Sequence, residues 1–271
     1  MRRSLLIVLL AAAPGPALRA QDTAHVVVVA TTDLHGHATA WDYVHDRPAP
    51  WGLVRAATVV DSLRAAYPGA VVLVDAGDLI QGNPFATYFA TVRPRLVNPT
   101  IDAMNAMRFD AATPGNHEFD FGLDVLTRAY GGAAFPFVAA NVFRLPRDTV
   151  AFPPHVVVSR GGVRVGITGF TTPGVMVWNG DRLRGRLLVR RIPDLAAAAV
   201  RATREAGADV VVALVHSGFG GGSSYDTTGA GAENEAHRLA ALPERPDLVI
   251  VGHTHRRLRD SVVNGVHFVQ P

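Results

Sequence analysis

The sequence predicts an α/β sandwich in which helices cover both faces of mixed β-sheets. Three observations predict it. Short runs of β-branched and other apolar residues recur along the chain, helix-like stretches separate several of these runs, and two glycine-containing turns join neighbouring runs.

The predicted strands are near-continuous apolar runs, as in strands that are buried on both faces. They lie at 25–33, 70–78, 135–142, 163–171, 209–217 and 247–255. The helix-like stretches lie at 52–66, 97–107, 122–130, 193–206 and 232–241. Pro193 and Asp194 suit the first turn of the fourth of these helices.

Two turns predict β-hairpins. Gly161-Gly162 separates two apolar runs, and Asn264-Gly265 stands between valine pairs near the end of the sequence. Hairpins among strands that alternate with helices make the predicted sheets mixed. The Gly/Ser-rich stretch 219–233 predicts a loop.

The composition excludes several functional classes. The chain has 271 residues, of which 48% are hydrophobic, so it can bury a full core as one large domain or two small ones. The net charge is only +3, and the basic residues are scattered arginines, which argues against binding to a nucleic-acid polymer. There is no cysteine, which excludes disulfides, thiolate metal sites and cysteine nucleophiles.

The amino terminus has the pattern of a secretory signal. Arg2 and Arg3 precede an apolar run at 5–13, and Pro-Gly-Pro follows at 14–16. The run is too short to span a bilayer comfortably, and no cysteine follows that could carry a lipid. We therefore expect residues 1–20 to be a signal peptide on an exported protein, periplasmic or extracellular, without a stable membrane anchor. The alternative is a buried amino-terminal helix, which the prolines would end early.

Polar side chains follow the predicted strands at their carboxyl ends, where ligands bind in open α/β sheets. They are Asp33 and His35, Asp78, His216, and His253 with His255. The stretch ATPGNHEFDFG (111–121) adds Asn116, His117, Glu118 and Asp120.

Each of these residues alone has an ordinary structural explanation. Asp78 could be a turn residue, Asn116 or Asp120 a helix cap, and His216 a hydrogen-bonded core histidine. Taken together they would need unrelated explanations at five strand ends. Five of the 11 histidines lie at these ends, which favours one shared site.

The chemistry of this set predicts a pair of metal ions. Carboxylate, carboxamide and imidazole groups without thiolates suit Zn²⁺, Mn²⁺, Co²⁺ or Fe²⁺. Seven candidate ligands are too many for one tetrahedral zinc but suit two ions that share a carboxylate. Two ions about 3.5–4 Å apart support hydrolysis at phosphorus, because they polarise phosphoryl oxygens and activate a water molecule.

The motifs DLH, GDLIQGNP, GNHEFDFG, VHSG and GHTH occur in this order, and they resemble the five motif blocks of the calcineurin-like metallophosphoesterases. Within that family the chain resembles the exported 5′-nucleotidases and the 2′,3′-cyclic-nucleotide 2′-phosphodiesterase/3′-nucleotidases. The resemblance covers nearly all of residues 25–271. It implies a four-layer αββα architecture with two mixed sheets, and a catalytic domain over residues 21–271.

The resemblance also implies a role for each residue. The first metal would be bound by Asp33, His35 and His255, the second by Asn116, His216 and His253, and both by Asp78. His117 would be the catalytic histidine, which stabilises the phosphoryl group or protonates the leaving oxygen, and Asp120 would orient it. Glu118 would either support the ligands from outside or be purely structural, and the sequence does not decide between the two.

The expected substrate is a small-molecule nucleotide, and the motifs leave the branch open. The segments at 41–58 and 98–119 resemble the cyclic-nucleotide group, whereas HEFDFG resembles the 5′-nucleotidases. In both groups a further C-terminal domain reads the nucleoside, and since this sequence shows none, we expect it to be a fragment. Two alternatives are a metal-binding module without turnover, against which the intact His117 argues, and a related hydrolase of a non-nucleotide ester.

Overall fold

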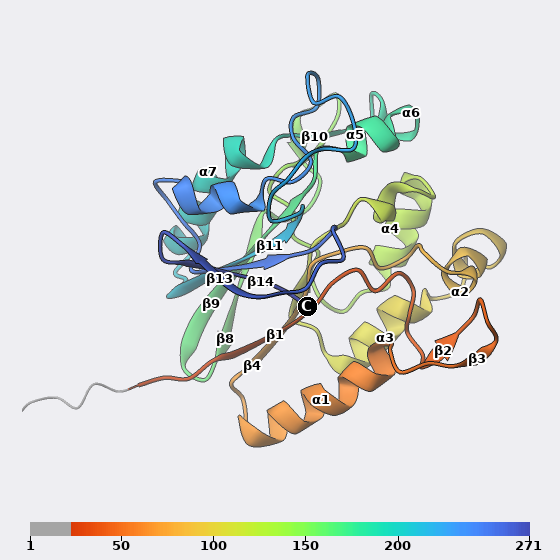
Figure 1. Ribbon diagram of the computed structural model, residues 1–271, viewed down its shortest axis with the longest axis horizontal. Coiled ribbons are helices and arrows are strands. Elements are labelled where there is room, and N and C mark those ends of the chain that lie inside the picture. The colour runs from red at the N-terminus through yellow and green to blue at the C-terminus, as the bar shows by residue number, and fades with distance from the viewer. Residues whose placement is uncertain (1–22) are drawn as a thin grey trace, which may run out of the picture.

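The computed structural model of the protein describes residues 23–271, and Figure 1 shows its strands gathered between helices. The signal peptide predicted at residues 1–20 lies outside the described residues. Among residues 23–271, none of the helices combines the length and the apolar character that a membrane span requires.

The first sheet is parallel and has the order β1-β4-β5. Its strands are β1 (Val27–Thr31), β4 (Val71–Asp75) and β5 (Ala111–Ala112). β1 and β4 pair in register from Val27 with Val71 to Thr31 with Asp75, so both strands end at the same edge of the sheet.

The second sheet is mixed, as predicted, and has the order β13-β14-β12-β11-β9-β8. Its strands are β8 (His155–Arg160), β9 (Val163–Thr171), β11 (Val210–His216), β12 (Leu248–Val251), β13 (Leu258–Val263) and β14 (Val266–Gln270). The four central strands run parallel, and the outer strands β8 and β13 join antiparallel through hairpins. The turns of those hairpins are Gly161-Gly162 and Asn264-Gly265, which confirms both predictions. All four turn residues have positive φ, as a two-residue hairpin turn of this hand requires.

The strand predicted at 135–142 is wrong. Phe137 makes an isolated β-bridge to Ala112, and the only strand residue of this segment is its last, Val142, which begins the short strand β6 (Val142–Arg144). Pro136 has no N–H to donate, and Ala140 donates its N–H to Gly169 of the other sheet. The segment therefore crosses from one sheet to the other. β6 pairs instead with β7 (Thr149–Val150) and β10 (Leu187–Val189) in a small antiparallel sheet.

Four of the five predicted helices form close to their expected bounds. They are α1 (Leu53–Ala66), α3 (Pro99–Met107), α4 (Leu123–Gly131) and α7 (Ile192–Glu205). The helix predicted at 232–241 is only a 3₁₀-helix, η3 (Ala236–Ala241). Its amino-terminal half does not form because Glu233 bonds His253, and the Asn234 side chain accepts the N–H of Gly218.

Short elements complete the chain. They are the hairpin β2 (Trp41–Asp42) and β3 (Arg47–Pro48), the helical turns α2 (Pro84–Thr87), α5 (Val175–Trp178) and α6 (Gly180–Leu183), the π-helix η1 (Tyr88–Val92) and the 3₁₀-helix η2 (His117–Phe119).

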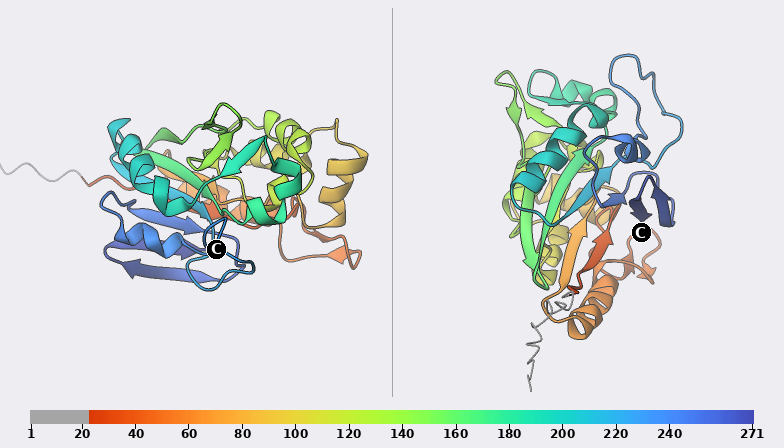
Figure 2. Two further views of the ribbon diagram at one scale, coloured as in Figure 1. Left: turned by 90° about the horizontal axis from the view of Figure 1, so that it is seen from above. Right: turned by 90° about the vertical axis from the view of Figure 1, so that its left-hand side faces the viewer.

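The two large sheets pack face to face with a helical layer outside each, which confirms the predicted α/β sandwich. Side chains alternate along a strand, so Val72 and Val74 of β4 pack against Ile167 and Leu214 of the second sheet. Leu73 points the other way, into a cluster with α1 and α3. On the far side, α7 and η3 cover the second sheet. Figure 2 shows α1 and α7 on opposite sides of the strands.

Candidate metal centre

The residues predicted to be ligands follow the strand ends in a backbone conformation that L-amino acids rarely adopt. Five of them have positive φ: Asp33 at 52°, His35 at 46°, Asp78 at 64°, His253 at 79° and His255 at 52°. Each such residue costs about 1–3 kcal/mol of backbone strain, and strain of this kind gathers at functional sites. It also explains why the strands stop short of the predicted bounds, since a left-handed residue cannot continue a β-strand.

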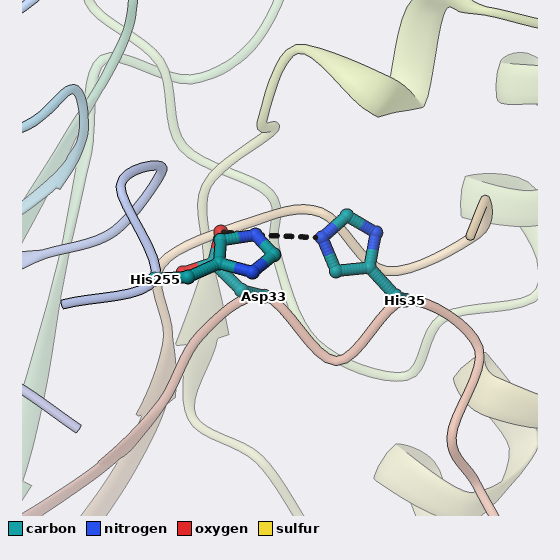
Figure 3. A group of neighbouring side chains, drawn as sticks. All are labelled: Asp33, His35 and His255. Carbon is teal, nitrogen blue, oxygen red and sulfur yellow. Dashed lines mark hydrogen bonds and ion pairs between the residues drawn. The ribbon is translucent and has the colours of Figure 1, made fainter.

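Asp33, His35 and His255 form a first cluster, shown in Figure 3. His35 Nε2 lies 3.1 Å from His255 Nε2, and His255 Nε2 lies 3.5 Å from Asp33 Oδ1. His35 Nδ1 must donate to the carbonyl oxygen of Gln81 at 2.9 Å, so its Nε2 carries a lone pair. That lone pair points at a second imidazole nitrogen and sits near a carboxylate, which is an arrangement suited to a cation.

Asp78, Asn116, His216 and His253 form a second cluster. His216 Nε2 lies 3.0 Å from Asp78 Oδ2 and 3.0 Å from Asn116 Oδ1, and His253 Nδ1 lies 2.8 Å from the same amide oxygen. His216 Nδ1 donates to Ala76 O at 2.7 Å, so a neutral His216 ring has its lone pair on Nε2. With the ring neutral, the groups that converge here are all acceptors, and either a proton on His216 or a cation between them would offset their repulsion.

The two clusters share their carboxylates. Asp33 groups with His35 and His255 on one side, and with Asp78 and His216 on the other. Asp78 Oδ2, 3.0 Å from His216, also lies 3.9 Å from His35 Nε2. The structure thus brings all seven predicted ligands together, and Asp78 reaches both halves as a bridging ligand must.

The electrostatics of the second cluster favour positive charge. Asp78 is 1% exposed; burial opposes its ionisation, but the neighbouring His216 imidazole outweighs burial and lowers the pKa of Asp78. Burial likewise opposes protonation of His216, yet the Asp78 carboxylate raises the pKa of His216. A divalent cation would supply positive charge beside the Asp78 carboxylate in place of the proton, and His216 could then stay neutral and act as a ligand. The donor set, the tautomers and the charge all fit divalent metal ions.

His117 and Asp120 lie beside this centre. His117 Nδ1 is 2.7 Å from Asp120 Oδ2, one turn along η2, and the His117 ring packs edge-on to that of His35 at 5.3 Å. The His117 N–H donates to Asp78 Oδ1 at 2.8 Å, which ties this pair to the ligands. The hydrogen bond with Asp120 raises the pKa of His117, although partial burial opposes it. His117 is thus a half-buried imidazole that holds a proton more readily than a free histidine.

Glu118 contacts the backbone of the two loops that carry Asp78 and Asn116. Its side chain is fully buried, and its two oxygens accept the N–H groups of Asp78, Leu79, Ile80 and Gly115 at 2.5–3.2 Å. These hydrogen bonds connect the loop that carries Asp78 to the turn that carries Asn116.

Glu233 and Asn179 also contact the site, and the sequence did not predict either of them. Glu233 Oε1 accepts from His253 Nε2 at 2.8 Å, which fixes that ring with Nδ1 toward Asn116. Asn179 Nδ2 donates to Asp120 Oδ1 at 3.1 Å. Glu233 lies at the end of a Gly/Ser-rich loop and Asn179 before a glycine, so neither position carries a motif that could have identified it.

Comparison with known proteins agrees with this geometry. The model of the calcineurin-like phosphoesterase family matches residues 26–257. The chain belongs to this family. Membership implies divalent metal ions and confirms that the protein is related to metal-dependent phosphoesterases, as the motifs predicted.

Individual relatives carry nucleotidase names. The chain is 40% identical over 241 residues to a 2′,3′-cyclic-nucleotide 2′-phosphodiesterase/3′-nucleotidase of Haemophilus influenzae, covering 84% of this chain and 36% of that protein. The solved calcineurin-like phosphoesterase YfkN of Bacillus subtilis superposes with a TM-score of 0.80 at 32% identity, over 92% of this chain and 81% of that one. A putative 5′-nucleotidase of Staphylococcus aureus superposes with a TM-score of 0.76 at 26% identity, over 90% and 48%. The chain thus spans little more than a third of the length of that Haemophilus relative.

Proposed function

We propose that the protein is an exported, metal-dependent phosphoesterase that hydrolyses small nucleotides, with 2′,3′-cyclic nucleotides and 3′-nucleotides as its substrates. The proposal depends above all on one observation: seven acceptor side chains from both sheets converge at one edge, with a protonatable His117 beside them. The preference for cyclic and 3′-nucleotides is supported by the names of relatives at 35–40% identity. We further propose that residues 1–20 are the export signal and residues 21–271 the catalytic domain.

The proposed ligands fall into two groups, one for each metal ion. Asp33, His35 and His255 would hold one cation, Asn116, His216 and His253 would hold the other, and Asp78 would be shared by both. Bound there, Zn²⁺, Mn²⁺, Co²⁺ or Fe²⁺ supplies Lewis acidity toward phosphoryl oxygens and toward water. Three of the four proposed ligand histidines, His35, His216 and His253, can turn a lone pair inward because Gln81, Ala76 and Glu233 accept the protons of their other nitrogens.

His117 supplies the proton chemistry. Its Nδ1 is hydrogen-bonded to Asp120, so Nε2 is the nitrogen that can donate a proton to the leaving oxygen. The leaving group of a nucleotide is a sugar alkoxide, which needs such a proton because it is strongly basic. Asp120 keeps the ring in the required tautomer and orientation and stabilises its charged form.

Metal analysis combined with substrate profiling tests the proposal. We expect about two divalent ions per chain and hydrolysis of 2′,3′-cyclic AMP and 3′-AMP faster than of 5′-AMP. A chelator should abolish the activity, and Mn²⁺, Co²⁺ or Zn²⁺ should restore it. A metal-loaded protein that cleaves none of these esters would contradict the proposal, and a preference for 5′-AMP would overturn the substrate assignment alone.

A further inference from the structure

The Asp120 carboxylate is held from two sides. Its Oδ2 meets His117 Nδ1 at 2.7 Å, and its Oδ1 accepts from the amide Nδ2 of Asn179 at 3.1 Å. Both oxygens are therefore committed to different partners. His117, Asp120 and Asn179 form a continuous chain of hydrogen bonds.

Asn179 is the most firmly placed member of this chain. It is 3% exposed, whereas the side chains of Asp120 and His117 are 27% and 36% exposed. Its backbone is fixed between two helical turns, because its N–H donates to Val175 O at 2.9 Å and its carbonyl accepts from Arg182 N at 3.0 Å. The amide is thus a rigid donor, while the carboxylate it holds is partly open to solvent.

A partly exposed aspartate has two rotatable side-chain bonds and can swing toward water. An Asp120 side chain turned toward water would lose the 2.7 Å contact with His117 Nδ1. A neutral amide suits this task, because it donates to the carboxylate without neutralising the negative charge that His117 needs beside it.

We infer that Asn179 is a positioning residue for the reaction: its amide fixes the Asp120 carboxylate, which in turn orients His117 toward the leaving oxygen. The inference rests on the proposed function, because it requires His117 to act on the leaving group. Asn179 touches neither the substrate nor the ligands in this role, and acts only through Asp120.

This role has a signature that general damage to the fold would not produce. A sugar alkoxide leaves poorly and depends on a proton from His117, whereas p-nitrophenolate leaves readily without one. Loss of the Asn179 amide should therefore slow hydrolysis of 3′-AMP much more than hydrolysis of p-nitrophenyl phosphate.

The test uses the metal-loaded full chain and the variant Asn179→Leu, which keeps the shape of the side chain and removes the donor. We expect kcat for 3′-AMP to fall about 10-fold, a part of the 10²–10⁴-fold that general acid catalysis supplies. KM for 3′-AMP and kcat for p-nitrophenyl phosphate should stay within about twofold, with unchanged metal content. Arg182→Ala, an exposed change in the neighbouring turn α6, is the matched control and should behave as the wild type.

A double-mutant cycle with Asp120→Ala separates positioning from packing. If Asn179 acts only through Asp120, Asn179→Leu adds less than about a twofold loss once Asp120 is gone. Should Asn179→Leu fail to fold, Asn179→Ala removes the donor without adding a charge beside Asp120 and is expected to show the same dependence on the leaving group.

Three results would overturn the inference: unchanged 3′-AMP turnover in a folded variant, equal losses on both esters, or losses that add to those of Asp120→Ala. In each of these the wild type is active, so the proposed function survives. If the metal-loaded wild type cleaves neither ester, the proposed function itself fails and the inference fails with it.

Discussion

At the scale of single residues, Asp78 and His117 are joined by a hydrogen bond, yet replacing them should have different effects on metal binding and activity. Asp78 is buried between the two ligand clusters, whereas His117 lies beside them. We expect His117→Ala to lower kcat by about 10²–10⁴-fold while both ions stay bound, since only proton transfer is removed. We expect Asp78→Ala to lose the ions and the activity together.

Metal content per chain and kcat, measured on the same preparations, check this pair. His117 donates to Asp78 through its backbone N–H, so the alanine variant keeps that contact and is a clean comparison. Full activity in either variant, or loss of metal from His117→Ala, would contradict the assigned roles.

Glu233 should act on metal affinity and not on the chemical step. Its carboxylate accepts the Nε2 proton of His253, and such partners of a ligand histidine typically contribute 10–100-fold to metal affinity. Glu233→Gln is therefore expected to weaken binding of the ion proposed to lie at His253 by about that factor, while kcat at saturating metal changes little. A metal titration followed by activity measures this, and Glu205→Gln, an exposed change at the end of α7, is the control. An unchanged titration curve for Glu233→Gln would show that His253 needs no such partner.

The convergence of the seven proposed ligands and of the His117–Asp120 pair could be predicted because these residues stand in contiguous motifs that resemble those of a known family. Glu233 and Asn179 could not. Their partners His253 and Asp120 lie 20 and 59 residues away along the chain, so their contacts exist only after folding. Glu118 stood in a motif, yet its role depended on four backbone N–H groups whose positions no motif encodes.

At the scale of elements, the site requires two loops to pass very close to each other. A Cβ atom on Gly115 would lie 2.2 Å from Asp78 Oδ1 and 2.5 Å from the Asp78 backbone nitrogen. We expect Gly115→Ala to push the loop after β4 away from η2, to lower the free energy of unfolding by about 1–3 kcal/mol, and to abolish metal binding. Denaturant unfolding and metal analysis measure both effects.

Gly131→Ala provides the comparison for Gly115→Ala. A Cβ at Gly131, the last residue of α4, would meet nothing within 4 Å, and alanine is the better helix former. This variant should be as stable as the wild type or slightly more so, with its metals retained. Equal behaviour of the two variants would show that the close approach at Gly115 has no role.

Strands and helices were predicted where local sequence and tertiary packing agree. β4 and β11 are β-branched runs buried on both faces, and they formed as expected. The two failures have different causes. Pro136 is a local one, because it lacks the N–H that a paired strand needs, whereas the side chains of Glu233 and Asn234 bond residues distant in sequence instead of forming the first turn of a helix.

At the scale of the whole molecule, the sandwich was predictable but the order of its strands was not. Periodicity shows which segments are buried, whereas strand order depends on which buried faces fit together, such as β14 inserting between β12 and β13. The position of the site follows from that order. β1 and β4 bring ligands from one sheet, β11 and β12 bring them from the other, and the N–H of His253 donates to Asp33 Oδ1 across the gap at 3.0 Å.

Because the ligands come from both sheets, metal binding should stabilise the sandwich as a whole. At a free metal concentration of about 100 times Kd, each ion adds about 2.7 kcal/mol to the free energy of unfolding, which for a chain of this size is a shift in Tm of roughly 5–10 °C. We expect a chelator to lower Tm by at least that amount and added Mn²⁺ or Zn²⁺ to restore it. Asp78→Ala, which should bind no ions, is expected to unfold at the same temperature with and without chelator. If chelator strips the ions from the wild type and Tm does not move, the ions do not couple the two sheets, and the site would have to be rigid without them.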